Sequence, residues 1–414
     1  MTKKTDTPAI RFKGFSDTWE QRKLGEMGQT YTGLSGKTKD DFGHGQARFV
    51  TYMNVFSNPI SNPEMTEPIE IDPKQNEVEV GDVFFTTSSE TPEEVGMSSI
   101  LLEKRGKTYL NSFCFGFRPS EKIDSYYLAY MLRSESTRAK IILLAQGISR
   151  YNISKNKVME IAVSLPSLDE QKMIGQYFSQ LDNLITLHQR KYEKLHNIKK
   201  SMLEKMFPKN GSNVPEIRFK GFTEAWEQRK LSNYLEVSNE KNTNDVYGKQ
   251  DVLSVSGDYG IVNQIEFQGR SFAGASVSNY GVVHTDDIVY TKSPLNANPY
   301  GIIKTNKGKT GIVSTLYAVY HPKKGTNSDF VQTYFEQHAR MNNYMHPLVN
   351  KGAKNDMKVS AENALKGYVS FPNYEEQKAI AEAFSIIDCL ITLHQRELEK
   401  LQNIKKSMLE KMFV

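Results

Sequence analysis

The chain has 414 residues, 38% hydrophobic and 24% charged, with a formal net charge of +5, which is ordinary for a globular protein of two or three domains. Its two cysteines exclude a disulfide framework and a cysteine metal cluster, which fits a reducing cytoplasm. The first residues contain no apolar signal-peptide core, and the run "IILLA" at 141–145 is too short to cross a membrane. We therefore expect a cytoplasmic protein.

The whole chain is organised as two copies of one unit. Residues 10–24 recur at 217–231 with 12 of 15 positions identical, and residues 184–207 recur at 390–413 with 21 of 24 identical. Between these flanks the two copies show little resemblance, apart from two short segments. A duplication that had only drifted would have changed its flanks as well. Constant flanks around divergent inserts indicate a shared frame that carries two parts with different tasks.

In chain order, an N-terminal segment (1–18) precedes a first globular domain (19–165). This domain contains short β-type runs at 47–56 and 82–87, separated by Gly, Asn and Pro, and then a helical stretch at 123–145. Short strands followed by helices predict a mixed α/β or α+β domain.

The second half of the chain follows the same order. A long helix (166–208) is followed by a linker that repeats the N-terminal segment (209–225), and then by a second mixed domain (226–371). The β-type run at 287–292 is an example of its strands. A second long helix (372–414) ends the chain. The predicted fold is thus two globular domains separated by two long helices, with an internal pseudo-two-fold duplication.

Both long helices begin with a capping signal and carry an apolar stripe. Ser167 with Glu170 forms a capping-box pattern after Pro166, and the second copy has Asn373 with Glu376 in the same places. Apolar residues then recur at alternating spacings of three and four, which is typical of a coiled-coil seam. The seam residues are Phe178, Leu181, Ile185, His188, Leu195, Phe384, Ile387, Ile391, His394 and Leu401.

We expect the two helices to bury their seams against each other in an antiparallel coiled coil of about 60 Å, with one domain at each end. His188 and His394 are interpreted as packing residues of the seam rather than as ligands or catalysts. The lysines near the helix ends fit two alternatives, a solvated end favoured by the helix dipole or a contact with DNA. These lysines are Lys199, Lys200, Lys205, Lys405, Lys406 and Lys411.

Polar loops follow the two strands that resemble each other, "GDVFFTTS" at 81–88 and "DDIVYTKS" at 286–293. Hydroxyl, amide and basic side chains in such loops can bind base edges or phosphates, although loops are polar in any protein. Other loops that combine glycine with basic or hydroxyl residues extend the set. The candidate DNA-binding residues are Ser35, Lys37, Thr38, Arg48, Thr86, Thr87, Ser88, Ser89, Arg150, Tyr151, Asn152, Ser256, Tyr259, Thr291, Lys292, Ser293, Asn296, Asn298, Lys351, Lys354 and Asn355.

Catalytic motifs fail on inspection. The segment "TGLSGKT" at 32–38 lacks the first glycine of a phosphate-binding loop, because Tyr31 stands in that position. The segment "ANPYG" at 297–301 is similar to the Asn-Pro-Pro-Tyr motif of amino-methyltransferases but lacks the second proline. Metal-type His/Cys clusters, paired-carboxylate nuclease motifs and Gly-x-Ser-x-Gly elbows are also missing. We expect a binding protein with no catalytic residue and no metal of its own.

Taken together, the repeated segments resemble the specificity subunit of Type I restriction–modification enzymes. The resemblance rests on "WEQRKL" at 19–24 and 226–231, on the "GDVFFT" and "DDIVYT" strands, on the helix entries "LPSLDEQK" and "FPNYEEQK", and on the helix ends "SMLEKMF". It covers nearly the whole chain, and its specificity lies in the duplicated order of these segments.

This resemblance implies that each insert is a target recognition domain for one half of a bipartite, asymmetric site in double-stranded DNA, and that the helices set the spacing. It also implies two methyltransferase subunits that use S-adenosylmethionine, and motor-nuclease restriction subunits that use ATP and Mg²⁺. The chain itself would be non-catalytic. The alternative is a coiled-coil scaffold whose two domains bind proteins, and steeply salt-dependent DNA binding would distinguish the two.

Overall fold

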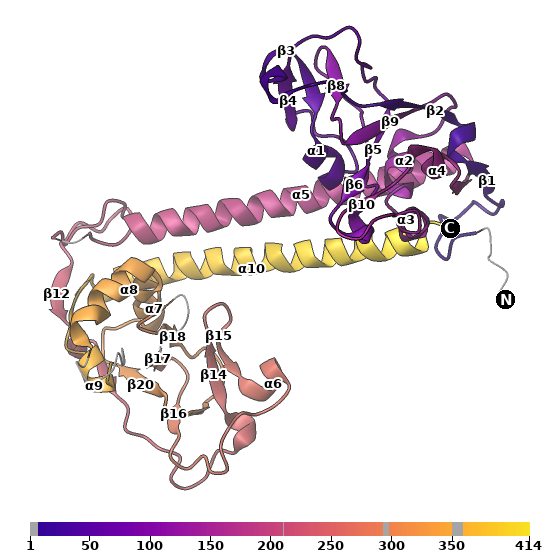
Figure 1. The fold of residues 1–414 in the computed structure, drawn as a ribbon. Helices are drawn as coiled ribbons and strands as arrows, with labels where there is room; N and C mark the ends of the chain where they lie inside the picture. Colours follow the sequence, from indigo (N-terminus) through magenta and orange to yellow (C-terminus); the bar gives the residue numbers. More distant parts are fainter. Residues whose placement is uncertain (1–6, 210, 293–297, 350–358) are drawn as a thin grey trace. The chain divides into compact units, whose positions relative to one another are not determined.

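The computed structural model describes residues 7–209, 211–292, 298–349 and 359–414 (Figure 1). The chain divides into two compact units. Unit 1 is Met1–Gln189 together with Gln395–Val414, and unit 2 is Arg190–His394. Each unit therefore combines one globular domain with part of both long helices, and each is described by itself.

Unit 1 is built on a four-stranded antiparallel sheet of order β2-β9-β5-β7 and a three-stranded sheet of order β4-β3-β8, in which β3 and β8 are parallel. Short ladders join β1 to β11 and β6 to β10. The strands are β1 Glu20–Lys23, β2 Gly28–Thr32, β3 Phe42–Val50, β4 Thr66–Ile69, β5 Val83–Thr86, β6 Ser88–Ser89, β7 Ser98–Ile100, β8 Thr108–Leu110, β9 Cys114–Pro119, β10 Tyr151–Asn152 and β11 Ala162–Leu165. The shorter helices are α1 Tyr52–Ser57, α2 Ser125–Met131, α3 Glu135–Ile142 and α4 Lys155–Met159.

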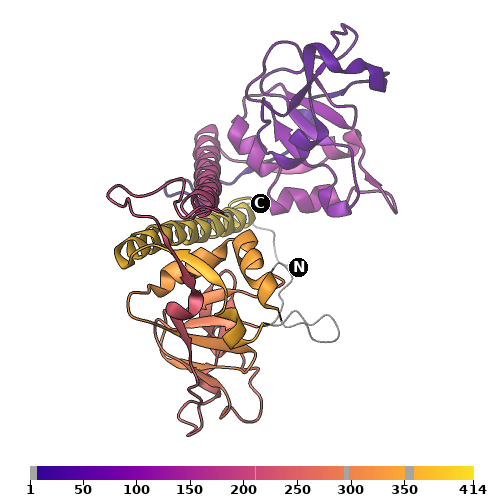
Figure 2. The same cartoon turned by 90° about the vertical axis from the view of Figure 1, so that its left-hand side faces the viewer.

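Unit 2 has a four-stranded antiparallel sheet of order β13-β20-β17-β18 and the two-stranded ladders β14-β15, β16-β19 and β12-β21. Helices α7 and α8 lie beside the first part of the long helix α10 (Figure 2). The strands are β12 Glu227–Lys230, β13 Leu235–Val237, β14 Leu253–Ser256, β15 Gly260–Asn263, β16 Gly281–Val283, β17 Ile288–Thr291, β18 Ile303–Thr305, β19 Gly311–Val313, β20 Tyr317–Pro322 and β21 Tyr368–Phe371. The shorter helices are α6 Gln264–Gln268, α7 Ser328–Glu336, α8 His338–Met345 and α9 Ala361–Ala364.

The two inserts share one topology although their sequences diverge. The central sheets correspond strand by strand, with β13, β20, β17 and β18 in the places of β2, β9, β5 and β7. The parallel pairing of β3 with β8 also has a counterpart, because Val252 beside β14 bridges Ile312 of β19 in parallel. The middle strands β5 and β17 are buried along their whole length. Such strands require apolar and β-branched residues rather than particular ones, so the fold survives divergence.

The aspartates that precede these middle strands hold the sheet together. Asp82 and Asp287 are buried, and each accepts a hydrogen bond from the backbone N–H three residues earlier (2.8 and 2.7 Å). Asp82 also accepts a hydrogen bond from Arg118 (2.8 Å), and Asp287 pairs with the ring of His321 (2.7 Å). Arg118 and His321 lie on the matching strands β9 and β20. The resemblance of the two strand segments thus has a structural cause.

The two long helices, α5 Leu168–Lys205 and α10 Tyr374–Lys411, have 38 residues each, and the prediction of two long helices is confirmed. At their first turns, the side chains of Ser167 and Asn373 accept a hydrogen bond from the backbone N–H three residues later (3.4 and 3.0 Å). This is the expected capping by side-chain oxygens.

The reciprocal half of the predicted capping box is wrong. The carboxylate of Glu170 does not turn back to the cap but accepts two hydrogen bonds from Arg11 (2.6 and 2.8 Å). Glu376 accepts two from Arg218 in the same way (2.6 and 2.7 Å). Both carboxylates are fully buried. A buried carboxylate needs a compensating positive charge, and the two N–H groups of a guanidinium supply it together with two hydrogen bonds. The repeated "IRFKGF" segment is thereby fixed to the start of each long helix.

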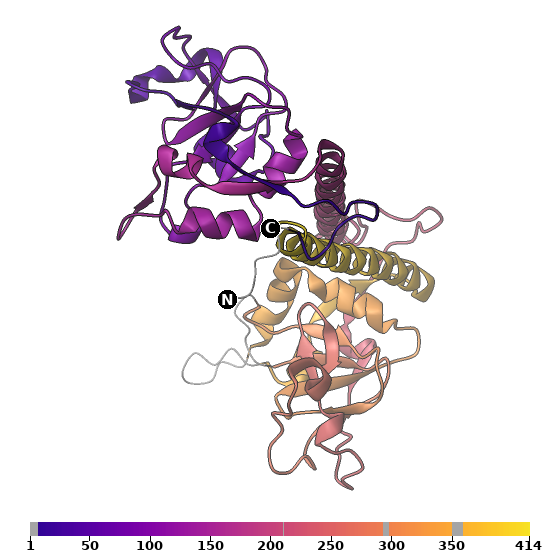
Figure 3. The same cartoon turned by 90° about the vertical axis from the view of Figure 1, so that its right-hand side faces the viewer.

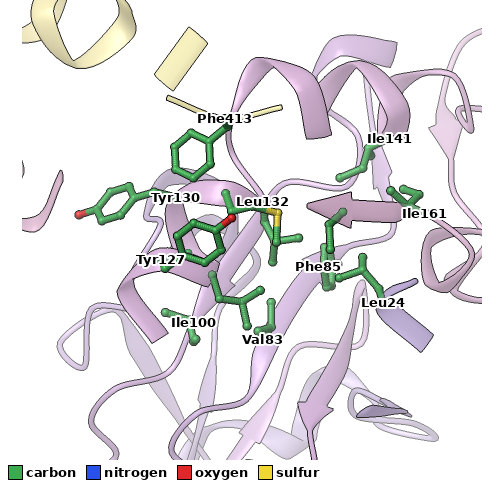
Figure 4. Packing of buried hydrophobic residues seen from close by; sticks show 14 of the residues in the cluster. Leu24, Val83, Phe85, Ile100, Tyr127, Tyr130, Leu132, Ile141, Ile161 and Phe413 are labelled. Atoms are coloured by element: carbon green, nitrogen blue, oxygen red, sulfur yellow. The ribbon is translucent and has the colours of Figure 1, made fainter. Parts of the chain in front are cut away.

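The end of α10 completes the core of unit 1. Phe413 packs against Tyr127 and Phe178, with ring centroids 5.7 and 5.6 Å apart, and the close-up shows it above the tyrosines of α2 (Figure 4). The first described residues of the chain run beside this helix end (Figure 3), where the N–H of Ile10 donates to the carbonyl of Lys411 (3.0 Å). The last residues of the chain are therefore part of the first domain's core.

The end of α5 has the equivalent place in unit 2. Phe207 packs against Trp226 and Phe330, with both pairs of ring centroids 5.9 Å apart. The N–H of Ile217 donates to the carbonyl of Lys205 (2.9 Å), as Ile10 does in unit 1. The repeated "SMLEKMF" thus fastens the end of a helix to a domain.

The predicted seam is partly visible inside the units. Phe178 and Leu181 belong to the core of unit 1, where Leu401 packs against them, and Phe384 belongs to the core of unit 2. Ile391 is also buried, and the other six seam residues are partly buried. Two contacts in each unit show that α5 and α10 run in opposite directions there. In unit 1 these are Phe178 with Phe413 and Asp182 with Lys405. In unit 2 they are Lys199 with Asp388 and Phe207 with Phe384.

Candidate nucleic-acid interface

In unit 1, the carboxyl end of β5 is where candidate residues from distant parts of the chain meet. Strand β6 directly follows β5 and pairs with β10, so that Ser89 is opposite Tyr151 and Ser88 is opposite Asn152. The guanidinium of Arg150 lies 5.7 Å from the ring centre of Phe113. The sequence prediction grouped 86–89 and 150–152 only by residue type, whereas the structure brings them together.

These residues fall into two groups, one exposed to solvent and one buried. Arg150 and Asn152 are exposed, and Thr87 is partly exposed. Thr86 and Ser88 are buried, and the expectation of an exposed polar loop from residue 86 is wrong for them because the chain continues as a strand there.

Two of the buried hydroxyls in unit 1 bond within the fold, whereas the buried hydroxyl of Ser88 has no hydrogen-bond partner among the described residues. The hydroxyl of Thr86 accepts a hydrogen bond from the N–H of Met97 (3.0 Å), and that of Ser89 donates to Glu94 (3.2 Å). In unit 2, the hydroxyl of Thr291 is buried and accepts from the N–H of Ile302 (2.8 Å). The threonine shared by "FFTT" and "VYTK" therefore holds the neighbouring strand.

The four candidates at the start of unit 1 lie apart from this group, and the interactions described for them are made within the domain. The N–H of Ser35 donates to Gln75 (3.0 Å), and Arg48 donates to Thr66 (2.6 Å). Lys37 forms an ion pair with Asp72 (2.9 Å).

The carboxylate of Asp41 closes the same loop. It accepts hydrogen bonds from both the N–H and the hydroxyl of Thr38 (2.7 and 2.9 Å), and these bonds lower the pKa of Asp41. The ammonium of Lys37 lowers the pKa of Asp72 for the same reason, that it stabilises the ionised form. Thr38 and Lys37 are therefore committed to loop structure.

In unit 2, Lys292 follows the buried strand β17 as Thr87 follows β5. It is partly buried, and burial together with the nearby charge of Lys241 lowers its pKa. The carboxylate of Glu362 acts on Lys292 in the opposite direction and raises its pKa. Lys292 thus places a basic side chain at this strand end, which suits an anion such as a phosphate. Lys241, which lies exposed on the loop before β14, was missed by the sequence prediction because its neighbour is distant in the chain.

The remaining candidates of unit 2 are divided between loops. The hydroxyl of Ser256 accepts from the N–H of Tyr259 (3.2 Å), whose ring is 63% exposed and lies 5.1 Å from the ring of Phe267. Asn298 is partly buried and its carbonyl accepts from Gly301 (3.0 Å). The candidates outside the described residues are Ser293, Asn296, Lys351, Lys354 and Asn355.

Two of the lysines near the helix ends fit neither of the alternatives considered for them. Lys199 forms ion pairs with Glu336 and Asp388 (2.5 and 2.6 Å), and Lys405 pairs with Asp182 and lies 5.5 Å from the ring centre of Tyr130. These two lysines are equivalent in the repeat, and each fixes a helix end within its unit.

The middle parts of the long helices expose a repeated apolar face. Leu184 and Leu187 of α5 are 44% and 46% exposed, and their repeats Leu390 and Leu393 of α10 are 37% and 50% exposed. They belong to the identical segment "LITLHQR" at 184–190 and 390–396. In the described part of the chain no group of three or more His, Cys, Asp or Glu could hold a metal, and no helix is long and apolar enough to cross a membrane.

The chain is similar to known proteins along most of its length. Residues 16–197 match the family model described as the Type I restriction modification DNA specificity domain. The putative type I restriction enzyme MjaX specificity subunit of Methanocaldococcus jannaschii is 24% identical in an alignment 418 residues long, gaps included, that covers 95% of this chain and 92% of that protein. The type I restriction enzyme MjaVIII specificity subunit of the same organism is 27% identical in an alignment 330 residues long, gaps included, that covers 75% of this chain and 74% of that one.

A solved structure has a similar fold. The S subunit of a Type-I restriction-modification system from M. genitalium aligns over 99% of both chains with a TM-score of 0.60 and 13% sequence identity. At this identity the likeness concerns the fold alone.

Proposed function

The chain belongs to the specificity subunits of Type I restriction–modification enzymes, and we propose that its two domains read the two halves of a bipartite, asymmetric DNA site. One observation carries this proposal. The two domains have the same sheet topology and the same attachment to the frame, yet different side chains at the ends of equivalent strands. Equal scaffolds with unequal surfaces suit two different sequences of bases, because bases are read by side chains in the grooves.

The repeated helix faces support the proposal of two methyltransferase subunits as partners. Leu184 and Leu187 in unit 1 and Leu390 and Leu393 in unit 2 expose the same apolar surface within identical sequence. Two identical surfaces suit two copies of one partner. The methyltransferase subunits would use S-adenosylmethionine, and restriction motor-nuclease subunits would use ATP and Mg²⁺, while this chain contributes no catalytic residue.

The helices also suit the role of a spacer. Thirty-eight residues in α5 and in α10 correspond to about 57 Å of helix. A helix of constant length would hold the number of base pairs between the half-sites constant. Deleting one heptad from both helices should change that number or prevent assembly of the complex.

A map of adenine methylation tests the proposed function. Cells that lack other such systems would express the chain with its methyltransferase partner, and methylated adenines should fall in one bipartite motif. Replacing residues 25–165 by the corresponding insert of another member should change one half of the motif only. A wild-type complex without any bipartite motif would overturn the proposal, as would a swap that changes both halves.

A further inference from the structure

The two domains present an equivalent turn at the same end of the central sheet. In unit 1 this turn joins β8 to β9, and the N–H of Cys114 donates to the carbonyl of Asn111 (3.1 Å). In unit 2 it joins β19 to β20, and the N–H of Tyr317 donates to the carbonyl of Ser314 (3.0 Å). The third residue of the turn is Phe113 in the first domain and its counterpart Leu316 in the second.

Both turns are attached to the strand end in the same way. The N–H of Thr87, one residue after β5, donates to the carbonyl of Phe113 (2.9 Å). The N–H of Lys292, one residue after β17, donates to the carbonyl of Leu316 (3.1 Å). In each turn this bond holds the backbone carbonyl of the third residue against the strand end. The side chain of that residue does not pack on the sheet.

These third residues are large, apolar and exposed. Phe113 is 53% exposed and Leu316 is 59% exposed, while the strand residues beside them, Thr86 and Thr291, are buried. A single exposed apolar side chain is ordinary in a globular protein. The same exposure at one structural position in two domains with unlike sequences is a second, independent observation, and it indicates a surface that contacts something.

The surroundings indicate which kind of molecule is contacted. The guanidinium of Arg150 lies 5.7 Å from the ring centre of Phe113, and the backbone N–H of the basic residue Lys292 donates to the carbonyl of Leu316 (3.1 Å). An apolar contact flanked by cations is complementary to a DNA groove, in which base edges lie between two rows of phosphates.

The same comparison argues against a protein partner at these turns. A partner that binds the chain in two copies should find the same residues twice, and the helices offer such a repeat with Leu184 and Leu390. The turns instead differ in their apolar residue, which is Phe113 in one and Leu316 in the other. They also differ in the residue whose N–H bonds to that carbonyl, Thr87 or Lys292. Difference at equivalent positions is what two unlike half-sites require.

We propose that Phe113 and Leu316 are specificity residues, each of which contacts base edges in the half-site read by its own domain. This inference rests on the proposed function of the chain. Arg150 and Lys292 hold the phosphates beside the contacted bases. Because an apolar side chain makes favourable contacts with some base edges and not with others, each of the two residues restricts the choice of base in one half-site only.

The test uses the chain assembled with its methyltransferase partner and a duplex that carries the mapped site. Phe113→Ser should weaken binding about tenfold, as the loss of one base contact does, and should relax the methylated motif in the first half-site alone. Leu316→Ser should do the same in the second half-site. Phe113→Leu keeps an apolar side chain, so it should retain most of the affinity but change the base preference in the first half-site. Val80→Ser is the matched control, because Val80 is 60% exposed and precedes β5 at the opposite end of the strand.

Each result decides the inference. If Phe113→Ser binds and methylates DNA as Val80→Ser does, the inference is wrong while the proposed function stands. If Phe113→Ser instead prevents assembly with the methyltransferase in the absence of DNA, the turn is a protein contact and the inference is again wrong. If the wild-type complex recognises no bipartite site, the proposed function fails first.

Discussion

The buried pair of Arg218 and Glu376 allows a quantitative test of how the repeated frame holds unit 2 together. The carboxylate is fully buried, the arginine side chain is 12% exposed, and two hydrogen bonds of 2.6 and 2.7 Å join them. Among the contacts described for Glu376, Arg218 supplies the only positive charge. Arg218→Met removes that charge. A broken buried pair costs about 3–5 kcal/mol, and we expect a loss of this size in the free energy of unfolding of unit 2.

The double variant separates the charge from the packing. Arg218→Met with Glu376→Met removes both charges and leaves apolar side chains of similar length, so we expect it to be more stable than Arg218→Met alone. Each unit contains one tryptophan, Trp19 or Trp226, and both are buried. Urea unfolding of a Trp19→Phe protein, followed by the fluorescence of Trp226, therefore reports on unit 2.

A matched arginine provides the control. Arg229 lies in the same domain and pairs with Glu227, but both side chains are more than half exposed, so Arg229→Met should leave the unfolding midpoint unchanged. The reasoning is refuted if Arg218→Met behaves like this control, or if the double variant is destabilised by the sum of the two single changes. The equivalent pair of unit 1, Arg11 with Glu170, should respond in the same way.

Three further predictions follow from the same contacts. Phe413→Ala should destabilise unit 1 by about 3–5 kcal/mol, as for other buried phenylalanines, and equal urea midpoints for variant and wild type would contradict its place in the core. Burial raises the pKa of the Cys114 thiol, so a reagent that reacts with thiolates at pH 8 should modify only the exposed Cys389 in the native protein. In urea it should modify both cysteines, and labelling of Cys114 in the native protein would be inconsistent with the fold. A circular permutant that joins Val414 to the start of the chain and opens the chain at 208–213 should fold with an unchanged circular dichroism spectrum. The reason is that both helix ends accept the same backbone hydrogen bond, Lys411 from Ile10 and Lys205 from Ile217. Loss of the fold would refute the equivalence of the two helix ends.

The frame is the part that the sequence alone determined. The recurrence of 10–24 at 217–231, with 12 of 15 positions identical, indicated a frame that both halves share. Regular spacing of apolar residues predicted two helices, and α5 and α10 begin and end close to the predicted bounds. What the sequence did not reveal was the partner of each repeated charge, because Arg11 and Glu170 are 159 positions apart. The capping box was predicted from local spacing, and a distant guanidinium overrode it.

Only the tertiary structure decided which polar residues are available to a ligand. "FFTT" and "VYTK" read alike as a strand followed by polar residues, but the hydroxyls of Thr86 and Thr291 are buried against the next strand. Exposure depends on the strand that packs alongside, and that strand comes from a divergent part of the chain. For the same reason Phe113 and Leu316 could not be matched in the sequence. Backbone hydrogen bonds define their equivalence, and backbone bonds do not depend on the side chains that differ.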